Sequence, residues 1–412
     1  MKHQRISLSI AVAAVMSAAT FVPAAYAIDV EAGDWKLSID GNVNAHYIYS
    51  RCDTNPNVIA GGLACIDDSS SSSSVSNGLL PAALTVSGAT TQGGYDIGFT
   101  FGLYPGISTI DGGSPNLLNT SSTTHTALGT AGLDIRQVFL TFGNQSMGTV
   151  MAGRNIGLFG GDAILNDMTL HGVGAGNGSY AAPANTSFGS IGMGYIYTDW
   201  LSQIDYTTPE IDGTKVTIGI FDPLNTLSQF PASKKAPGIH AKIAYTLGSL
   251  YLSTSGLYQQ QRDTTSSFVP DSGNYSSWAA DFGGKYDFAG LEVAGWYYVG
   301  KGVGTTGLFV NSDDGLGGPR NSDGYLAQVT YKIMSTKFGI NYGQSVLKAA
   351  SGDTGLARAE LVEKNDKVTV GIYQDLTENL MLLMEFSRLE SQNQAGQTNT
   401  SRNVNIGAFL KF

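Results

Sequence analysis

The chain reads TVMAGRNIGLFGGDAILNDMTLHGVGAGNGSYAAPANTSFGSIGM from Thr149 to Met193. This stretch begins as a short alternating strand and continues as a connection of more than thirty residues. Such a connection is unusual in a compact domain unless it is functional or disordered. It carries many apolar residues and, between them, Asp162, Asp167 and His171. A segment that is partly apolar and partly charged can pack one face on a wall while its other face meets water. We therefore expect residues 157–194 to fold into the lumen of a β-barrel and narrow it.

Segments of about ten residues with alternating apolar and polar character recur along the rest of the chain. In one of them, Val368, Val370 and Ile372 alternate with Thr369 and Gly371. This alternation is the sequence signature of a transmembrane barrel strand. We predict sixteen such strands, over residues 34–50, 79–89, 94–104, 132–143, 148–156, 195–208, 214–222, 237–247, 250–260, 277–288, 291–301, 323–333, 336–345, 366–376, 379–389 and 402–412.

The connections between these strands are sorted by length. Short ones fall at residues 144–147, 209–213, 248–249, 289–290, 334–335 and 377–378. Long ones fall at residues 51–78, 105–131, 157–194, 223–236, 261–276, 302–322, 346–365 and 390–401. Outer-membrane barrels have short periplasmic turns and long extracellular loops, whereas a soluble β-sandwich has no reason to sort its connections. The sequence therefore predicts an all-β fold, a sixteen-stranded antiparallel transmembrane β-barrel whose third long loop folds inward.

The first residues predict export. Lys2 and Arg5 precede an apolar region over residues 6–22, and a small-x-small Ala-Tyr-Ala site follows. This pattern is typical of a secretory signal peptide, here residues 1–27, which leaves residues 28–412 as the barrel. The mature part contains no run of eighteen apolar residues, which excludes a membrane-spanning helix.

Composition supports the same class of fold. Glycine is abundant at 53 of 412 residues, proline is scarce at 12, and tyrosine and phenylalanine number 20 and 17. Glycine-rich, aromatic-rich chains with few helix formers favour β-structure. Without Lys2 and Arg5, the 23 basic residues become 21 against 33 acidic ones, a net charge of -12. This balance argues against a nucleic-acid partner, since no basic patch is present in the sequence.

Two cysteines, Cys52 and Cys65, lie close together near the start of the mature chain. In an exported protein they predict one disulfide that closes a short loop. A two-cysteine metal site is the alternative, which the absence of a nearby histidine disfavours. Between these cysteines and the second predicted strand, the six serines Ser69–Ser74 predict a low-complexity surface loop.

One strand contains an apparent conflict. Val138, Leu140 and Phe142 share their alternation with Arg136 and Asp134. A charge on the lipid face at mid-depth costs about 2–4 kcal/mol, so we exclude that placement. Two remain open: Arg136 lies above the membrane, or this wall is covered by neighbouring subunits or by the inserted loop.

Four short motifs together resemble the general diffusion porins of Gram-negative outer membranes. They are residues 136–139 (RQVF), residues 148–155 (GTVMAGRN) followed by the long loop, residues 206–209 (YTTP) and the terminal Phe412. The resemblance covers essentially the whole mature chain in strand number and loop order. It implies a homotrimer of barrels in outer-membrane lipid, each with its own pore and an inward third loop.

The resemblance also implies which residues line the constriction. Arg154 is expected on the barrel wall facing Asp162 and Asp167 of the loop, although a salt bridge that only tethers the loop is an equal alternative. The second and sixth predicted strands carry no basic residue, unlike those of many relatives. Charge from the far wall is then expected from Lys242, Lys285 and Lys332.

Sixteen strands enclose a barrel too wide for side chains to fill, which leaves an aqueous channel. We therefore predict an outer-membrane porin for passive diffusion of ions and small hydrophilic solutes. The inward loop sets the size limit and the lumen charges set ion preference. The net charge of -12 and the missing arginines predict a weak cation preference. The alternatives are a channel specific for a sugar, phosphate or carboxylate, and a barrel adhesin.

An enzyme is not expected. A hydrolase needs a serine or cysteine nucleophile near a histidine. The histidines of the mature chain, His46, His125, His171 and His240, are scattered, and no HExxH or GxSxG motif occurs. We therefore predict no catalytic residue, no cofactor and no metal site.

Overall fold

A computed structural model describes residues 27–53, 56–65, 71–107, 133–176, 186–226, 235–261 and 274–412. The predicted signal peptide, apart from residue 27, lies outside the described residues. The elements are β1 (Ile28–Ala32), β2 (Trp35–Cys52), β3 (Ser71–Ser76), β4 (Ala83–Gln92), β5 (Tyr95–Pro105), β6 (Leu133–Asn144), β7 (Gly148–Ile156), α1 (Gly161–Leu165), β8 (Trp200–Thr207), β9 (Thr214–Phe221), β10 (Gly238–Leu247), β11 (Leu250–Gln261), β12 (Tyr275–Phe288), β13 (Leu291–Lys301), β14 (Asn321–Ile333), β15 (Thr336–Lys348), α2 (Gly355–Glu360), β16 (Val362–Asp375), β17 (Leu380–Asn393) and β18 (Thr398–Lys411).

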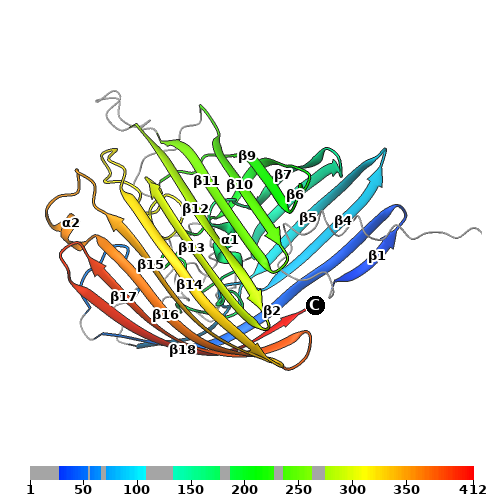
Figure 1. The fold of residues 1–412 in the computed structure, drawn as a ribbon. Coiled ribbons are helices and arrows are strands. Elements are labelled where there is room, and N and C mark those ends of the chain that lie inside the picture. Colours follow the sequence, from blue (N-terminus) through cyan, green and yellow to red (C-terminus); the bar gives the residue numbers. More distant parts are fainter. Residues whose placement is uncertain are drawn as a thin grey trace, which may run out of the picture.

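Sixteen of these strands, β2 and β4 to β18, form one closed antiparallel barrel (Figure 1). Each pairs with its neighbour in the chain, and β18 closes the ring by pairing with β2 over Asn42–Cys52. The strand number and antiparallel order predicted from the alternation are thus confirmed. Closure matters because an open sheet edge in a bilayer leaves backbone N–H and C=O groups without partners.

The short strand β3 corrects one prediction. Ser71–Ser74 belong to β3, which pairs with β2 from Arg51 to His46, and not to a loop. The reason lies in the length of β2. Its partner β4 reaches only to Asn42, so the same edge of β2 beyond that residue would otherwise be unpaired. The serine run supplies the missing hydrogen-bonding partner.

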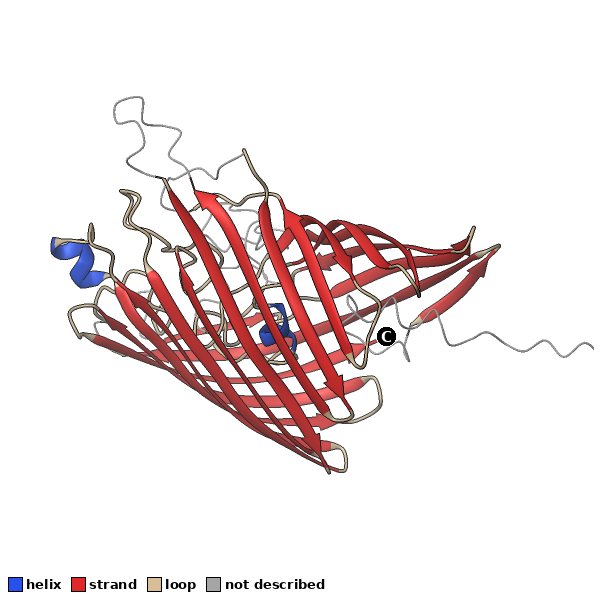
Figure 2. Cartoon of the chain, turned by 45° about the horizontal axis from the view of Figure 1, so that its top comes forward, coloured by secondary structure: helices blue, strands red, loops and turns tan. Residues whose placement is uncertain are grey.

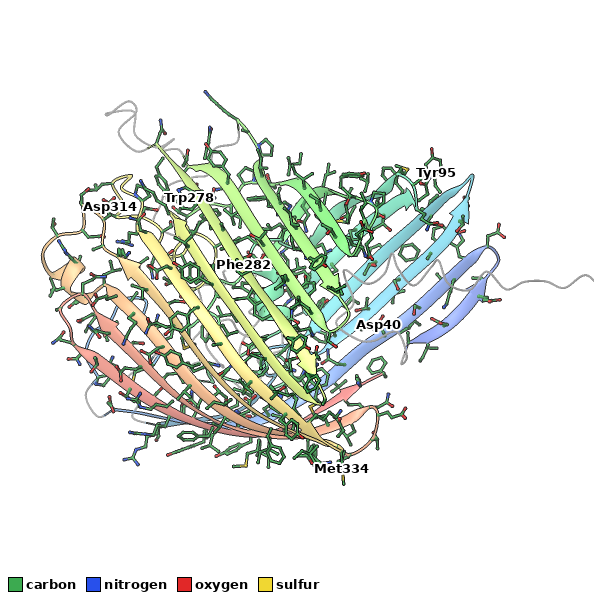
Figure 3. All side chains as sticks on the ribbon, viewed as in Figure 1. Asp40, Tyr95, Trp278, Phe282, Asp314 and Met334 are labelled. Atoms are coloured by element: carbon green, nitrogen blue, oxygen red, sulfur yellow. A yellow bond between two sulfur atoms is a disulfide. The ribbon has the colours of Figure 1, made fainter. Side chains whose placement is uncertain are left out.

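Side chains alternate between the two faces of the wall, with apolar residues outside and polar residues inside. On β18, Ile406 is 59% exposed whereas its neighbour Asn405 is fully buried. Trp278 and Phe282 stand on the outer face of β12 (Figure 3). This is the reverse of a soluble barrel and is expected of one that is surrounded by lipid.

Short turns and long loops lie at opposite ends. Tyr95 and Met334 mark the short-turn end, and Asp314 marks the long-loop end (Figure 3). The turn between β12 and β13 has two residues, Ala289 and Gly290, with φ of 49° and 85°. A two-residue turn with positive φ at both positions matches the twist of the strands it joins.

The barrel interior is partly filled by the chain's own loops. The short helix α1 lies among the strands in both cartoon views (Figures 1 and 2). Apolar loop residues such as Leu170 and Phe188 form a buried cluster with Trp296 and Leu389 of the wall. Among the described residues, no helix is long and apolar enough to cross a membrane.

Candidate functional site

The loop after β7 enters the barrel, where α1 and the residue before it contact the inner face of β10, β11 and β12. Gly160 donates its N–H to Asp281 Oδ2 of β12 at 2.7 Å. Asp162 accepts hydrogen bonds from Lys242 Nζ of β10 at 3.1 Å and from the Tyr251 hydroxyl of β11 at 2.7 Å. Asp162 and Lys242, both predicted from the sequence to line the constriction, therefore meet inside the barrel.

Asp167 lies deeper in the same loop and is 4% exposed. Its Oδ2 accepts a 2.8 Å hydrogen bond from the Tyr195 hydroxyl, and its Oδ1 accepts one from Asn341 Nδ2 of β15 at 3.1 Å. Thr169 donates to Oδ1 from both its N–H and its hydroxyl, at 2.9 Å each. With its oxygens occupied in this way, Asp167 braces the loop against the wall.

The middle of the loop is held by a residue that the sequence interpretation did not single out. Glu385 of β17 is 1% exposed, and its Oε2 accepts the N–H groups of Val173 and Gly174 at 2.9 and 2.8 Å. Its Oε1 accepts the Tyr373 hydroxyl at 2.6 Å. The sequence does contain a sign of this role. Glu385 lies on the polar face of an alternating strand, and a buried carboxylate there needs several hydrogen-bond partners.

The three wall lysines lie on the inner faces of β10, β12 and β14, and each has a carboxylate close by. Lys242 is next to Asp162, as described above. Lys285 Nζ lies 3.7 Å from Glu292 of β13. Lys332 Nζ lies 2.9 Å from Asp375 of β16, with half of its side chain exposed. Each of these lysines therefore has its acidic partner within 4 Å, on the inward loop for Lys242 and on a neighbouring or nearby strand for Lys285 and Lys332.

Arg154 lies on the other side of the wall from the one expected. In the β-ladder it pairs with Val138 of β6 and Ser202 of β8. Val138 is 37% exposed, and Ser202 is also on the outer face. A cavity of about 840 Å³ on that side is lined by Arg154, Val138 and Ile204, among others. The sequence analysis expected Arg154 inside the lumen, facing the loop. The structure places it on the outer face, because Arg154 alternates in phase with the outward Val150.

Arg136 is on the inner side because β6 contains a bulge. Gly102 of β5 pairs with Gln137, and Leu103 pairs with Ile135, so Arg136 is the extra residue. A bulge inserts one residue and so reverses which face the following side chains take. This resolves the apparent conflict in the alternation, since Val138 can be outside while Arg136 is inside.

The position of Arg136 is fixed by charge and by aromatic rings. Its Nε donates to Asp134 Oδ2 at 2.9 Å, and both side chains are about 6% exposed. The guanidinium carbon lies 5.2 Å from the ring centre of Tyr104 and 5.9 Å from that of Trp200. A buried cation held by a carboxylate and two rings contributes to the rigidity of this wall.

Two further loops enter the long-loop end. Residues 302–320, between β13 and β14, contribute Val303 and Phe309, each fully buried, to a cluster with Phe159 and Ile196. The segment between Cys52 and Cys65 is closed by the predicted disulfide, and it contributes Leu63 to the other apolar cluster. The narrowing is therefore built from more than the single loop that the sequence interpretation identified.

The geometry can now be set beside known proteins. A sequence-family model described as Gram-negative porin matches residues 7–394. The chain belongs to the Gram-negative porin family. Porins are outer-membrane channels, so this porin is a channel for passive diffusion in the outer membrane, and the family points to a channel rather than to an enzyme. A comparison with curated proteins found no match.

Solved structures share the fold at low sequence identity. The outer membrane channel DcaP of Acinetobacter baumannii has a TM-score of 0.68 and 16% identity, over 93% of this porin and 99% of DcaP. OmpF of Salmonella typhi, in complex with daunomycin, has a TM-score of 0.58 and 12% identity, over 93% and 100%. OmpT of Vibrio cholerae has a TM-score of 0.56 and 14% identity, over 93% and 100%. The shared fold runs across nearly the whole chain.

Proposed function

We propose that ions and small hydrophilic solutes pass this porin beside the inward loop, in the part of the lumen that the loop and the wall it contacts leave open. The observation that carries the proposal is the contact of Asp162 with Lys242 and Tyr251. It supports a loop that crosses the lumen, so that a solute must pass beside it. The Lys242 side chain is 25% exposed, which gives passing ions and solutes access to it.

We further propose that charge selectivity is weak and favours cations. Lys242, Lys285 and Lys332 each have a carboxylate within 4 Å, so much of the positive field of this wall is cancelled locally. The mature net charge of -12 then supports a small excess of cations in and around the channel. No residue on this route is asked to perform chemistry, because passage needs only water and a polar wall.

The membrane setting is part of the same proposal. We infer that residues 1–27 are removed on export and that the short turns face the periplasm. We also infer a homotrimer embedded in outer-membrane lipid. OmpT of Vibrio cholerae, one of the structures with this fold, has been obtained in a trimer form.

The test is the reversal potential of the purified protein in a planar bilayer under a potassium chloride gradient. A small potential of the sign that indicates potassium preference is expected. Clear chloride preference would refute the charge proposal. The size limit is measured separately, by swelling of liposomes that contain the protein in sugars of increasing size, and a limit set by the full barrel bore would refute the role of the loop.

A further inference from the structure

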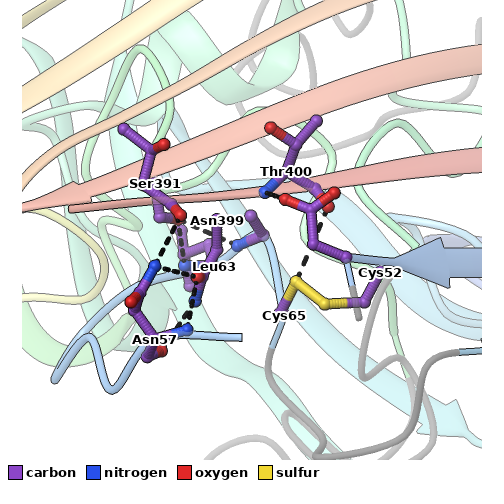
Figure 4. Close-up of a disulfide and its surroundings, with 10 residues drawn as sticks. Cys52, Asn57, Leu63, Cys65, Ser391, Asn399 and Thr400 are labelled. Carbon is purple, nitrogen blue, oxygen red and sulfur yellow. Dashed lines mark hydrogen bonds between the residues drawn. A yellow bond between two sulfur atoms is a disulfide. The ribbon is translucent and has the colours of Figure 1, made fainter. Parts of the chain in front are cut away.

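The disulfide closes a segment whose position the channel function does not by itself explain. Cys52 is the last residue of β2, and Cys65 follows it by 13 positions. Cys65 Sγ lies 3.7 Å from the carbonyl oxygen of Thr400 on β18 (Figure 4). The bond therefore fixes the end of the segment beside the seam where the barrel closes. We call the described residues 56–65 the strap.

The strap runs along the inner face of three neighbouring strands. Asn57 and Asn399 of β18 bond reciprocally, with Asn57 N–H to Asn399 Oδ1 at 2.7 Å and Asn399 Nδ2 to Asn57 O at 2.8 Å. Further along, the N–H groups of Leu63 and Ala64 both donate to Ser391 Oγ of β17 at 2.9 Å (Figure 4). These contacts with inward-facing side chains of β17 and β18 place the strap inside the long-loop end of the barrel, not on its outer surface.

The strap is also tied to β16 and to the segment before it. Asn365 Nδ2 donates to the carbonyl of Gly61 at 3.1 Å, and Asn365 Oδ1 accepts the Leu63 N–H at 3.1 Å. Ala60 N–H donates to Glu360 O at 2.7 Å, just before β16. These hydrogen bonds hold the backbone of the strap in one register along the wall.

At its inner end the strap meets the two other inward loops at a single point. A Cβ placed on Gly192 would lie 2.6 Å from Leu63 Cδ1 and 3.0 Å from Thr306 Oγ1. Gly192 belongs to the loop after β7, and Thr306 to the loop after β13. The Tyr197 N–H donates to Thr306 O at 2.7 Å, which joins the latter two loops directly. The strap and the two other loops therefore pack so closely around Gly192 that no side chain would fit at this position.

We propose that the disulfide-closed strap forms part of the constriction and sets the size limit of the channel together with the other two loops. Leu63 is 7% exposed and Ala64 is fully buried, so the strap occupies interior space that would otherwise hold water. The disulfide ties the Cys65 end of the strap to the end of β2, which restricts the conformations that the strap can adopt. The inference takes passive diffusion through the barrel as given.

The experiment compares three variants with the wild-type porin in planar bilayers and in liposomes. The Cys52→Ser/Cys65→Ser double variant frees the strap, and Leu63→Ala removes its contact with Gly192 while the disulfide stays. Val58→Ala is the matched control, because Val58 is in the same strap but 64% exposed. The first two are expected to raise single-channel conductance by about two-fold and to admit larger sugars, because the narrowest section limits flow. The control is expected to match the wild type.

Folding is checked by the heat-dependent shift of the barrel in gel electrophoresis. If the double variant does not fold, the folded wild-type porin is treated with dithiothreitol in the bilayer, and the same rise in conductance is expected. Unchanged conductance and sugar limit in Leu63→Ala and in the reduced protein would overturn the inference. In that case wild-type channel steps would still be seen, whereas failure of the channel function itself would abolish the steps in every sample.

Discussion

Lys242 on the barrel wall and Asp162 on the inward helix α1 form an ion pair with 3.1 Å between Nζ and Oδ1. The Tyr251 hydroxyl bonds to the other carboxylate oxygen. A residue near the start of a loop thus reaches strands that lie some eighty positions later in the chain. This pair links the position of the loop to the charge that a passing ion meets.

Asp162→Asn is expected to shift ion preference toward chloride. The change keeps the shape and one hydrogen-bond acceptor but removes the negative charge, so the Lys242 ammonium acts on the lumen without its partner. The reversal potential in a potassium chloride gradient measures the shift. Glu378→Gln removes the same charge from an exposed short turn and serves as the control. Equal potentials in the two variants would show that Asp162 does not face the ion path.

Glu385→Ala is expected to loosen the middle of the loop and to destabilise the barrel by about 3 kcal/mol, since several hydrogen bonds to a buried carboxylate are lost together. The free energy of unfolding in urea measures this. Glu390→Ala on the same strand removes only a partly exposed pair with Arg388 and should cost below about 1 kcal/mol. Similar losses in both variants would argue against the loop anchor.

Arg136→Ala is expected to lower the free energy of unfolding by about 3 kcal/mol, because it leaves the carboxylate of Asp134 buried without its cation. The double variant Arg136→Met/Asp134→Asn removes both charges and should recover much of that loss. Urea unfolding of the two proteins, under the same conditions, checks this. A double variant no more stable than the single one would contradict the account of the bulge.

Arg320 donates two hydrogen bonds to Asp353, from Nε to Oδ2 at 2.8 Å and from Nη2 to Oδ1 at 2.6 Å, and we expect this clamp to resist acid. Burial raises the pKa of the Asp353 carboxyl, but the hydrogen bonds from Arg320 and from the Ala350 N–H, together with the charges of Arg320 and Arg358, outweigh burial and hold the pKa below its ordinary value of 3.8. A carboxyl with a lowered pKa stabilises the folded state above its unfolded pKa, and this is lost only as the pH falls through the lowered value.

Hydrogen exchange of peptides that cover residues 311–320 and 349–354 tests this clamp. Protection, corrected for the intrinsic effect of pH, should stay constant from pH 7 to pH 5 and fall only below about pH 3.8. Arg320→Met should lack this protection at every pH. Protection that already declines between pH 7 and pH 5 in the wild type would assign the clamp to another group.

The strands were predictable from the sequence because the alternation of apolar and polar residues reports directly which face each side chain takes. The same rule, applied to Val150 and Arg154, indicates the outward placement of Arg154, and the resemblance to porins led to the opposite expectation. The bulge at Arg136 was not predictable, since it depends on register with a partner strand. Contacts such as Leu63 with Gly192 join segments over a hundred residues apart, and no local pattern encodes them.

The most direct test of the central claim is single-channel recording of the purified porin with polyethylene glycols of increasing size. The account predicts discrete ohmic steps, and exclusion of polymers well below the size that an empty sixteen-stranded barrel admits. Such exclusion would place the narrowing inside the barrel, where residues 157–176 and 186–194 lie. Absence of steps, or entry of polymers as wide as the open barrel, would contradict it.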